Sequence, residues 1–260
     1  MSNAAFHKIT LDIEANLFNE LANTIDFESV AKGRIGNHLV QVSDKGVPIV
    51  RTTTKYNIPA YNFLPVHHRI VEGINNTMVG IPTQHFNNAL IEVYGADYYK
   101  MNFHSDQSLD LANDSYIGLF SCYENPSNLS EQHLRQLHIK DKVSDEEVLY
   151  SLTHNSVVLF SVANNTKFLH KIILNGAPNP KNAVPDNKWL GITFRTSKTY
   201  IQFENGMPYF PNGKVLELAN KEQETEFYQL RGQENRSLDF VYPDLAYTIN
   251  VADTMLPTNQ

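Results

Sequence analysis

A succession of short apolar stretches between residues 88 and 203 limits what this 260-residue chain can fold into. The stretches are rich in β-branched and aromatic residues and are separated by clusters of turn-forming residues, as strands are. No helical pattern alternates with them, which favours a double-sheet jelly roll over a parallel α/β sheet. The sequence predicts eight strands here, at 88–94, 99–104, 116–123, 147–152, 156–162, 168–174, 189–196 and 199–203.

The flanking segments carry helical patterns. Apolar spacing predicts an amphipathic helix over residues 9–24, and a second helix beginning at Pro65. Short strands are expected at 38–42 and 47–51, and another helix within 218–236. The expected fold class is therefore mainly β with flanking helices (α+β), around a double-stranded β-helix core.

The chain is long enough for one large β domain. We expect a single catalytic domain over residues 1–260, with long insertions at 124–142 and 175–188. Its expected parts are N-terminal helices and a substrate lid (1–86), the jelly-roll core (87–203) and a C-terminal extension (204–260), whose segment 240–247 packs back on the core.

Composition restricts the partners. Lys and Arg number 21 against 28 Asp and Glu, a net charge of −7, whereas proteins that follow duplex phosphates usually carry clustered cations. This balance favours a small-molecule substrate over nucleic acid. The single Cys122 excludes an internal disulfide and fits a reducing compartment. No apolar run approaches the ~20 residues of a membrane span, so we expect a cytoplasmic protein without membrane contact.

The tripeptide His104-Ser105-Asp106 ends one of the predicted strands. Residues two apart on an extended backbone point to the same face, so this imidazole and carboxylate can bind one ion from the same side. A second histidine, His170, follows a later strand, with His154 as the alternative. Two imidazoles and one carboxylate on one face suit non-haem Fe(II) that reacts with O2.

Such a donor set leaves three positions on an octahedral Fe(II) ion. A 2-keto acid can fill two of them and O2 the third. The far carboxylate of the co-substrate then needs a cation inside an apolar barrel, and arginine suits this because it stays charged when desolvated. Arg195, within a hydrophobic strand, is the candidate.

The order of these motifs resembles the AlkB-like branch of the Fe(II)/2-oxoglutarate-dependent dioxygenases. The resemblance covers residues 87–203. Its blocks are Leu90-Ile-Glu-Val-Tyr94 with Phe103-His104-Ser-Asp106, then Leu152 to Phe160 leading to Phe168-Leu-His170, then Ile192-Thr-Phe-Arg195.

The resemblance implies roles for individual residues. His104, Asp106 and His170 would be the catalytic iron ligands. Arg195 and Tyr94 would hold the C5 carboxylate of 2-oxoglutarate, with Ser197 donating a hydrogen bond on the same face.

This sequence departs from the family pattern at two of the compared positions. The DNA-repair members carry Asn where this chain has Glu92, and a second Arg where it has Ile201. Demethylation of nucleic acid therefore does not follow from the resemblance.

The implied activity is oxidation of a substrate C–H bond with Fe(II), 2-oxoglutarate and O2, giving succinate and CO2. The expected substrate of this hydroxylase is a metabolite, nucleoside or natural-product intermediate, with an N-methyl group as one possible target. Asp106 favours hydroxylation over halogenation, which needs that ligand position vacant. The alternatives are an AlkB-type nucleic-acid demethylase and a non-enzymatic jelly-roll binding module.

The loop 52–63 is polar and aromatic. Its side chains Tyr56, Tyr61 and Phe63 are expected either to form a substrate lid with aromatic walls or to pack in the core.

Overall fold

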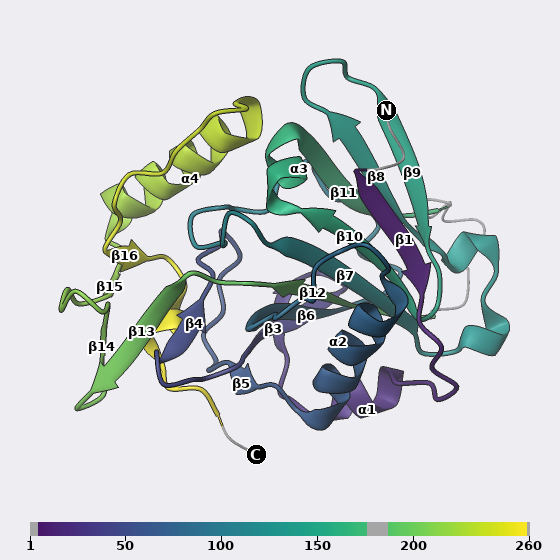
Figure 1. Cartoon of the computed structure of the whole chain (residues 1–260), viewed down its shortest axis with the longest axis horizontal. Helices are drawn as coiled ribbons and strands as arrows, with labels where there is room; N and C mark the ends of the chain where they lie inside the picture. The colour runs from purple at the N-terminus through teal and green to yellow at the C-terminus, as the bar shows by residue number, and fades with distance from the viewer. Residues whose placement is uncertain (1–4, 176–186, 259–260) are drawn as a thin grey trace.

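The computed structural model describes residues 5–175 and 187–258 and is built around two facing sheets (Figure 1). The larger sheet contains β1 (Phe6–Thr10), β2 (Glu28–Ala31), β3 (Arg34–Val40), β5 (Tyr61–Asn62), β6 (Asn88–Tyr94), β7 (Tyr116–Tyr123), β10 (Ser156–Ser161) and β12 (Trp189–Arg195). Its order is β1-β10-β7-β12-β6-β3-β2, and β5 pairs with β3. The smaller sheet has the order β11-β8-β9, made by β8 (Arg135–Asp141), β9 (Glu147–Leu152) and β11 (Phe168–Leu174).

A single backbone bridge completes the smaller sheet. His104 pairs with His170 in an isolated antiparallel bridge, which places residue 104 beside β11. From β6 onward the chain crosses between the sheets at each step except from β8 to β9, which form a hairpin. β6, β7, β10 and β12 lie in the larger sheet, and residue 104, β8, β9 and β11 in the smaller one. This alternation of antiparallel strands defines a jelly roll. The predicted fold class is confirmed.

Both faces of the larger sheet are covered. On β6, Ala89, Ile91 and Val93 belong to a core shared with the helices α1 (Phe18–Asn23) and α2 (Pro65–Thr77). Residues of opposite parity, such as Leu90 and Tyr94, point toward the smaller sheet. All seven residues of β6 are buried, as expected for a strand covered on both sides.

The helix predicted to start at Pro65 is confirmed. Pro65 occupies the first helical turn, where its missing N–H costs no hydrogen bond. The backbone N–H of Leu64 donates to Nδ1 of His67 at 2.9 Å, which caps the helix. Ile70 and Ile74, one turn apart, are fully buried against the larger sheet.

The helix predicted over 9–24 is largely wrong. Its first residues belong to strand β1, which pairs with the edge of β10, and only Phe18–Asn23 form a helix. The backbone N–H of Leu11 instead donates to the carbonyl of Asn155 at 2.8 Å. Pairing with β10, which is distant in the chain, therefore determines the structure of this segment in place of the helix suggested by the apolar spacing.

Three predictions within the core region also need correction. The insertion predicted at 124–142 contains β8, a central strand of the smaller sheet. The strand predicted at 99–104 is reduced to the bridge at His104. The strand predicted at 199–203 exists as β13 (Thr199–Glu204), but it lies outside the jelly roll and pairs with β4 (Val47–Ile49) and β14 (Met207–Tyr209).

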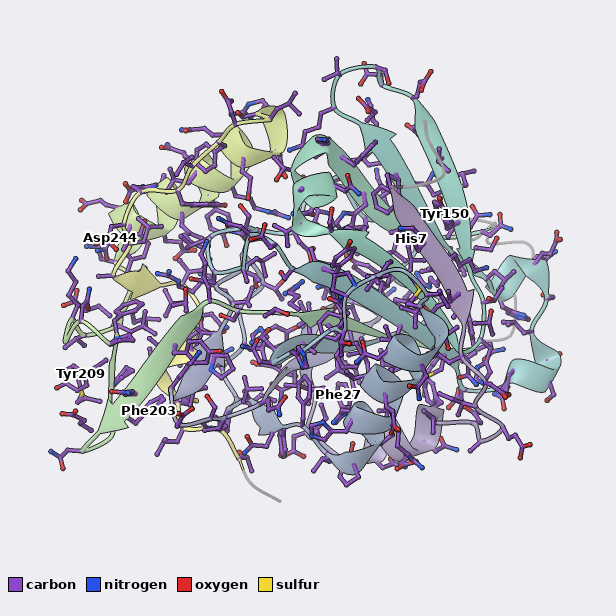
Figure 2. All side chains as sticks on the ribbon, viewed as in Figure 1. His7, Phe27, Tyr150, Phe203, Tyr209 and Asp244 are labelled. Carbon is purple, nitrogen blue, oxygen red and sulfur yellow. The ribbon has the colours of Figure 1, made fainter. Side chains whose placement is uncertain are left out.

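The C-terminal extension packs against the core. It contains β15 (Glu217–Leu218), α4 (Lys221–Arg236) and β16 (Tyr247–Thr248), so the predicted helix is confirmed. Phe227 of α4 shares an apolar cluster with Leu245 and Tyr247. Outside the extension, Nη1 of Arg51 donates to the carbonyl of Leu245 at 2.6 Å. Figure 2 shows Phe203, Tyr209 and Asp244 on this side of the molecule, away from His7 and Tyr150 on β1 and β9.

The remaining elements are short. They are α3 (Val162–Lys167) and the 3-10 turns Pro126–Asn128, Glu131–His133 and Val251–Thr254. Most of the insertion predicted at 175–188 lies outside the described residues. Within the described ranges, no helix has the length and apolar character needed to cross a membrane.

Candidate metal centre

Main-chain pairing brings the two predicted histidines together. The N–H of His104 donates to the carbonyl of His170 at 3.0 Å, and the N–H of His170 donates back at 2.7 Å. Their imidazole ring centroids are 4.6 Å apart. With Asp106, the three side chains offer ligand atoms that all lie within 4.8 Å of one another. The alternative, His154, is engaged elsewhere, since its Nδ1 accepts from the N–H of Tyr123 at 3.1 Å.

Asparagine side chains fix the irregular segment that carries the carboxylate. Asn165 of α3 accepts from the N–H of Asp106 at 2.9 Å and donates to its carbonyl at 2.7 Å. Asn235 of α4 accepts from the N–H of Ser105 at 2.9 Å. The main chain on both sides of the ligand is therefore held by elements that come much later in the sequence.

The protonation states suit a divalent cation. Burial, then the neighbouring His170, lowers the pKa of His104 to about 3, so this imidazole is neutral. Burial alone would raise the pKa of Asp106, but Arg195 and the two histidines outweigh it and hold the pKa well below its usual range. His104 Nδ1 lies 3.0 Å from the carbonyl of Asn102, which directs Nε2 toward the shared space. Neutral imidazoles and an anionic carboxylate are the donors that such a metal needs.

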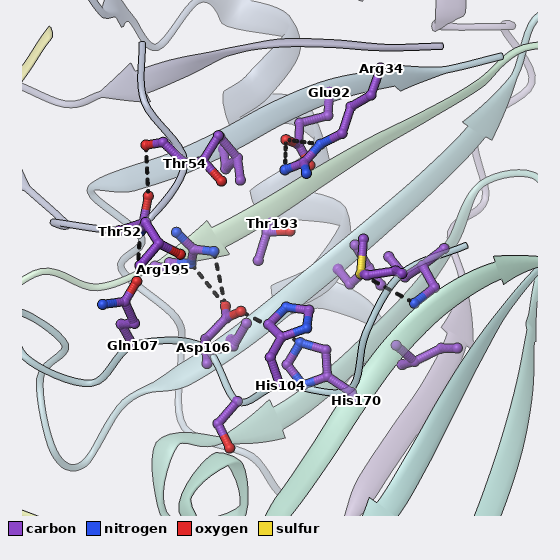
Figure 3. A pocket seen from close by; sticks show the side chains of 18 of the residues that line it. Arg34, Thr52, Thr54, Glu92, His104, Asp106, Gln107, His170, Thr193 and Arg195 are labelled. Carbon is purple, nitrogen blue, oxygen red and sulfur yellow. Dashed lines mark hydrogen bonds and ion pairs between the residues drawn. The ribbon is translucent and has the colours of Figure 1, made fainter. Parts of the chain in front are cut away.

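The three side chains line a cavity of about 90 Å³ between the sheets. Arg195 lies at their end of it (Figure 3). Its Nε and Nη2 each lie 3.0 Å from Oδ2 of Asp106. Its buried Nη1 has no hydrogen-bond partner among residues 5–175 and 187–258. The guanidinium thus orients the carboxylate and keeps one donor available.

A second arginine–carboxylate pair lies on another side of the cavity, with Thr193 between the two in Figure 3. Arg34 Nε donates to Oε1 of Glu92 at 2.8 Å. The hydroxyl of Tyr56 donates to the same oxygen at 3.1 Å, and that of Tyr94 to Oε2 at 2.5 Å. Burial, then the charge of Glu92, raises the pKa of Tyr94 well above its usual range, so the phenol keeps its proton.

Gly36 gives Tyr56 access to this carboxylate. Gly36 lies opposite Glu92 on β3, and a Cβ there would lie 2.7 Å from the hydroxyl of Tyr56. Any larger residue would therefore displace the phenol from Glu92.

Tyr94 and Arg195, which were predicted to hold the same carboxylate of 2-oxoglutarate, lie far apart along their strands. On the paired strands β6 and β12, Tyr94 lies opposite Trp189 whereas Arg195 lies opposite Asn88. At roughly 3.3 Å per residue, this six-residue offset is about 20 Å of backbone. Tyr94 donates to Glu92 and Arg195 to Asp106, so the two side chains do not converge on one group.

Ser197 was predicted to face the co-substrate, and this is wrong. β12 ends at Arg195, so the strand alternation does not extend to residue 197. Its hydroxyl donates to the carbonyl of Ile49 at 2.5 Å and accepts from the N–H of Thr199 at 3.1 Å. Ser197 therefore stabilises the turn between β12 and β13.

The aromatic side chains of the loop 52–63 pack in the core and do not form a lid. Tyr56 is fully buried, and the hydroxyl of Tyr61 donates to Asp26 at 2.7 Å. Phe63 contacts Phe194 edge-on within the core under α2. The start of the same loop, residues 52–54, does line the cavity.

Several residues that line the cavity could not be predicted from motifs in the sequence. Arg34 lies on β3 and Arg231 on α4, each far along the chain from the motifs. Only the pairing of β3 with β6 and the packing of α4 bring them to the cavity. Both sheets also contribute apolar side chains to the lining, among them Leu119, Leu137, Phe160 and Ile172, and Met101 is a further apolar lining residue.

Comparison with known proteins finds likeness in fold. No protein-family model and no curated protein matches the sequence. The structure of OsALKBH1 is similar at 12% identity and a TM-score of 0.44, covering 74% of this chain and 98% of that one. A Pseudomonas putida prolyl-4-hydroxylase is similar at 12% identity and a TM-score of 0.40, covering 74% and 92%. At these identities and TM-scores the likeness specifies no activity for the chain.

Proposed function

We propose that this protein is a non-haem Fe(II) and 2-oxoglutarate-dependent oxygenase that hydroxylates a C–H bond of a small molecule. The observation that supports it is the convergence of His104, Asp106 and His170, whose ligand atoms lie within 4.8 Å of one another inside a jelly roll. Bound Fe(II) would supply the redox chemistry in which O2 and 2-oxoglutarate are converted to succinate and CO2 while the substrate is oxidised.

The residues around the donors have distinct tasks. Arg195 holds Asp106 in place through two donors, and its Nη1 is available for a carboxylate of the co-substrate bound beside the metal. Tyr94 and Arg34, around Glu92, are the groups suited to the distal carboxylate. The two carboxylates of 2-oxoglutarate would thus meet different arginines, in place of the shared site predicted from the sequence.

The lining of the cavity supports a small-molecule substrate. A few polar groups, among them Arg195, Thr193 and Gln107, lie beside apolar side chains around a space of about 90 Å³, as in ligand-binding pockets. The apolar side chains of the lining exclude water from the neighbourhood of the donors. A C–H bond of the substrate, or of an N-methyl group that it carries, would face the metal beside these side chains.

Succinate formation tests the proposal directly. Purified protein with Fe(II), ascorbate, 2-oxoglutarate and O2 should release succinate, and Asp106→Asn should lose nearly all of it. Asp114→Asn makes the same chemical change at an exposed position and serves as the control. Equal turnover in both variants would refute the assigned ligand set.

A nucleic-acid demethylase is the alternative activity. It requires salt-sensitive binding of single-stranded DNA or RNA, because phosphate contacts release counterions. Absence of both metal binding and succinate formation would leave a non-enzymatic binding module.

A further inference from the structure

The C-terminal helix α4 brings one arginine to the metal cavity. Arg231 lines the cavity together with His104 and Asp106. The side chain is half-buried, and its Nε is fully enclosed. Across residues 5–175 and 187–258, no hydrogen bond or ion pair engages its guanidinium.

The other arginines of this region differ in this respect. Arg34 pairs with Glu92, Arg51 with Asp110 and Arg195 with Asp106. A buried N–H donor such as Nε of Arg231 is costly to leave without a partner, so this position favours an anion that arrives with a ligand.

The position of Arg231 is fixed by its neighbours on α4. Glu234 accepts from the N–H and the hydroxyl of Ser108, at 2.9 and 2.6 Å, and from the hydroxyl of Tyr242 at 2.7 Å. Asn235 holds the N–H of Ser105. The helix is therefore bonded to the segment that carries the proposed ligands. The nearest carboxylate in its own turn, Glu234, is occupied by other donors.

The surroundings of Arg231 define a ligand with two kinds of surface. Thr52, Thr54 and Gln107 make a polar part of the lining, whereas Leu119, Leu137 and Phe160 make an apolar part. Arg195 and Arg34 already serve the co-substrate in the proposed function. A third arginine in the same cavity is thus available for the second ligand, the substrate itself.

We propose that Arg231 binds the substrate, and that the substrate is a small molecule with one carboxylate or phosphate group next to an apolar part that is oxidised. Calling this ligand the substrate depends on the proposed function. The anion site itself depends only on Arg231 and its surroundings.

Calorimetry on the metal-free, full-length protein tests the anion site. Inorganic phosphate and acetate are titrated separately, which distinguishes a phosphate ester from a carboxylate. Arg231→Gln should bind the preferred anion about tenfold more weakly, because one charge-assisted interaction is lost. Arg231→Lys should retain part of the affinity. Arg236→Gln, an exposed arginine of the same helix, should bind like the wild type.

Paramagnetic relaxation locates the bound anion. With Mn(II) added, the ³¹P or acetate ¹³C relaxation of the bound probe should accelerate in the wild type and in Arg236→Gln, but not in Arg231→Gln. The proposal is overturned when wild type binds neither anion, when Arg231→Gln binds as the wild type does, or when Mn(II) leaves the bound probe unaffected. If Mn(II) itself does not bind, the proposed function fails, while the calorimetry still decides the role of Arg231.

Discussion

The cavity has two arginine–carboxylate pairs, Arg195 with Asp106 and Arg34 with Glu92. They differ in which of their donors and acceptors remain available to a ligand. Asp106 gives Oδ2 to Arg195 and keeps Oδ1 on the side of His170, 3.5 Å from Nε2. Glu92 has both oxygens engaged, by Arg34, Tyr56 and Tyr94. The pair at the candidate metal centre therefore has donor and acceptor capacity for a ligand. In the other pair both carboxylate oxygens are bonded within the protein, so a ligand there meets only the donors Arg34 and Tyr94.

The backbone explains this difference. Asp106 lies on an irregular segment held by Asn165, and within the described part of the chain no strand supplies a hydroxyl donor to its carboxylate. Glu92 lies in the middle of β6, with Gly36 on one side and Gly191 on the other. Glycines on both flanking strands leave room for large side chains, and Tyr56 uses the space over Gly36 to reach the carboxylate. A carboxylate with one oxygen on the side of His170, and a carboxylate with both oxygens bonded (the closed pair), thus each lie beside an arginine.

The largest expected effect is on metal affinity, which should distinguish the two carboxylates. Asp106→Asn keeps the shape but removes the anionic ligand, and should lower Mn(II) affinity more than about 100-fold. Glu92→Gln makes the same change in the closed pair and should alter this affinity by less than about threefold. Electron paramagnetic resonance of free Mn(II) measures both. Similar losses in the two variants would show that the pairs are not functionally different.

The second prediction concerns stability. Glu92→Ala leaves the buried Arg34 without its carboxylate and should cost about 3–5 kcal/mol of the free energy of unfolding. Arg34→Met/Glu92→Met removes both charges and should recover most of this loss, since apolar replacements of buried pairs are often neutral. Urea titration followed by circular dichroism measures the difference. A double variant as unstable as the single one would contradict a paired, desolvated interaction.

The third prediction concerns the distal carboxylate. Glu92→Gln removes a negative charge beside Arg34 and should tighten 2-oxoglutarate binding about tenfold, because like charges near the same arginine repel. The fluorescence of Trp189, the single tryptophan, reports this directly, as its ring lies 4.9 Å from Tyr94. Glu72→Gln, exposed on α2, is the control. Unchanged affinity in Glu92→Gln would place the distal carboxylate elsewhere.

The smallest effect is expected for an exposed ion pair. Lys214 and Asp244 lie 2.7 Å apart with side chains 54% and 78% exposed. Lys214→Gln should change the free energy of unfolding by less than about 1 kcal/mol, because water screens the pair. If Lys214→Gln lost as much free energy of unfolding as Glu92→Ala, burial would not explain the difference between the two ion pairs.

The sequence predicts the grouping of His104, Asp106 and His170 because their geometry depends on short spacing in the chain and on strand pairing. His104 and Asp106 are two residues apart, and His170 follows from the pairing of an alternating strand. The second arginine–carboxylate pair was out of reach, because Arg34 meets Glu92 across 58 residues of chain through the pairing of β3 with β6.

The strand predictions were wrong where β propensity alone does not determine which strand a segment pairs with. The stretch 199–203 has strong β character and does form a strand, but it pairs with β4 outside the core. β8 has the alternation expected of a half-buried strand, with Arg135, Leu137 and Ile139 buried and polar residues between them. Its short length within a polar insertion hid this pattern, and only its pairing with β9 and β11 establishes it.

The reciprocal main-chain bonds between residues 104 and 170 have a consequence for assembly. Because the imidazoles face one another only in this register, slippage by one position would turn one of them away from Asp106. A metal bound as proposed would therefore link the same two residues whose main chains join this edge of the smaller sheet. Removing that metal with a chelator would weaken the pairing of residues 104 and 170.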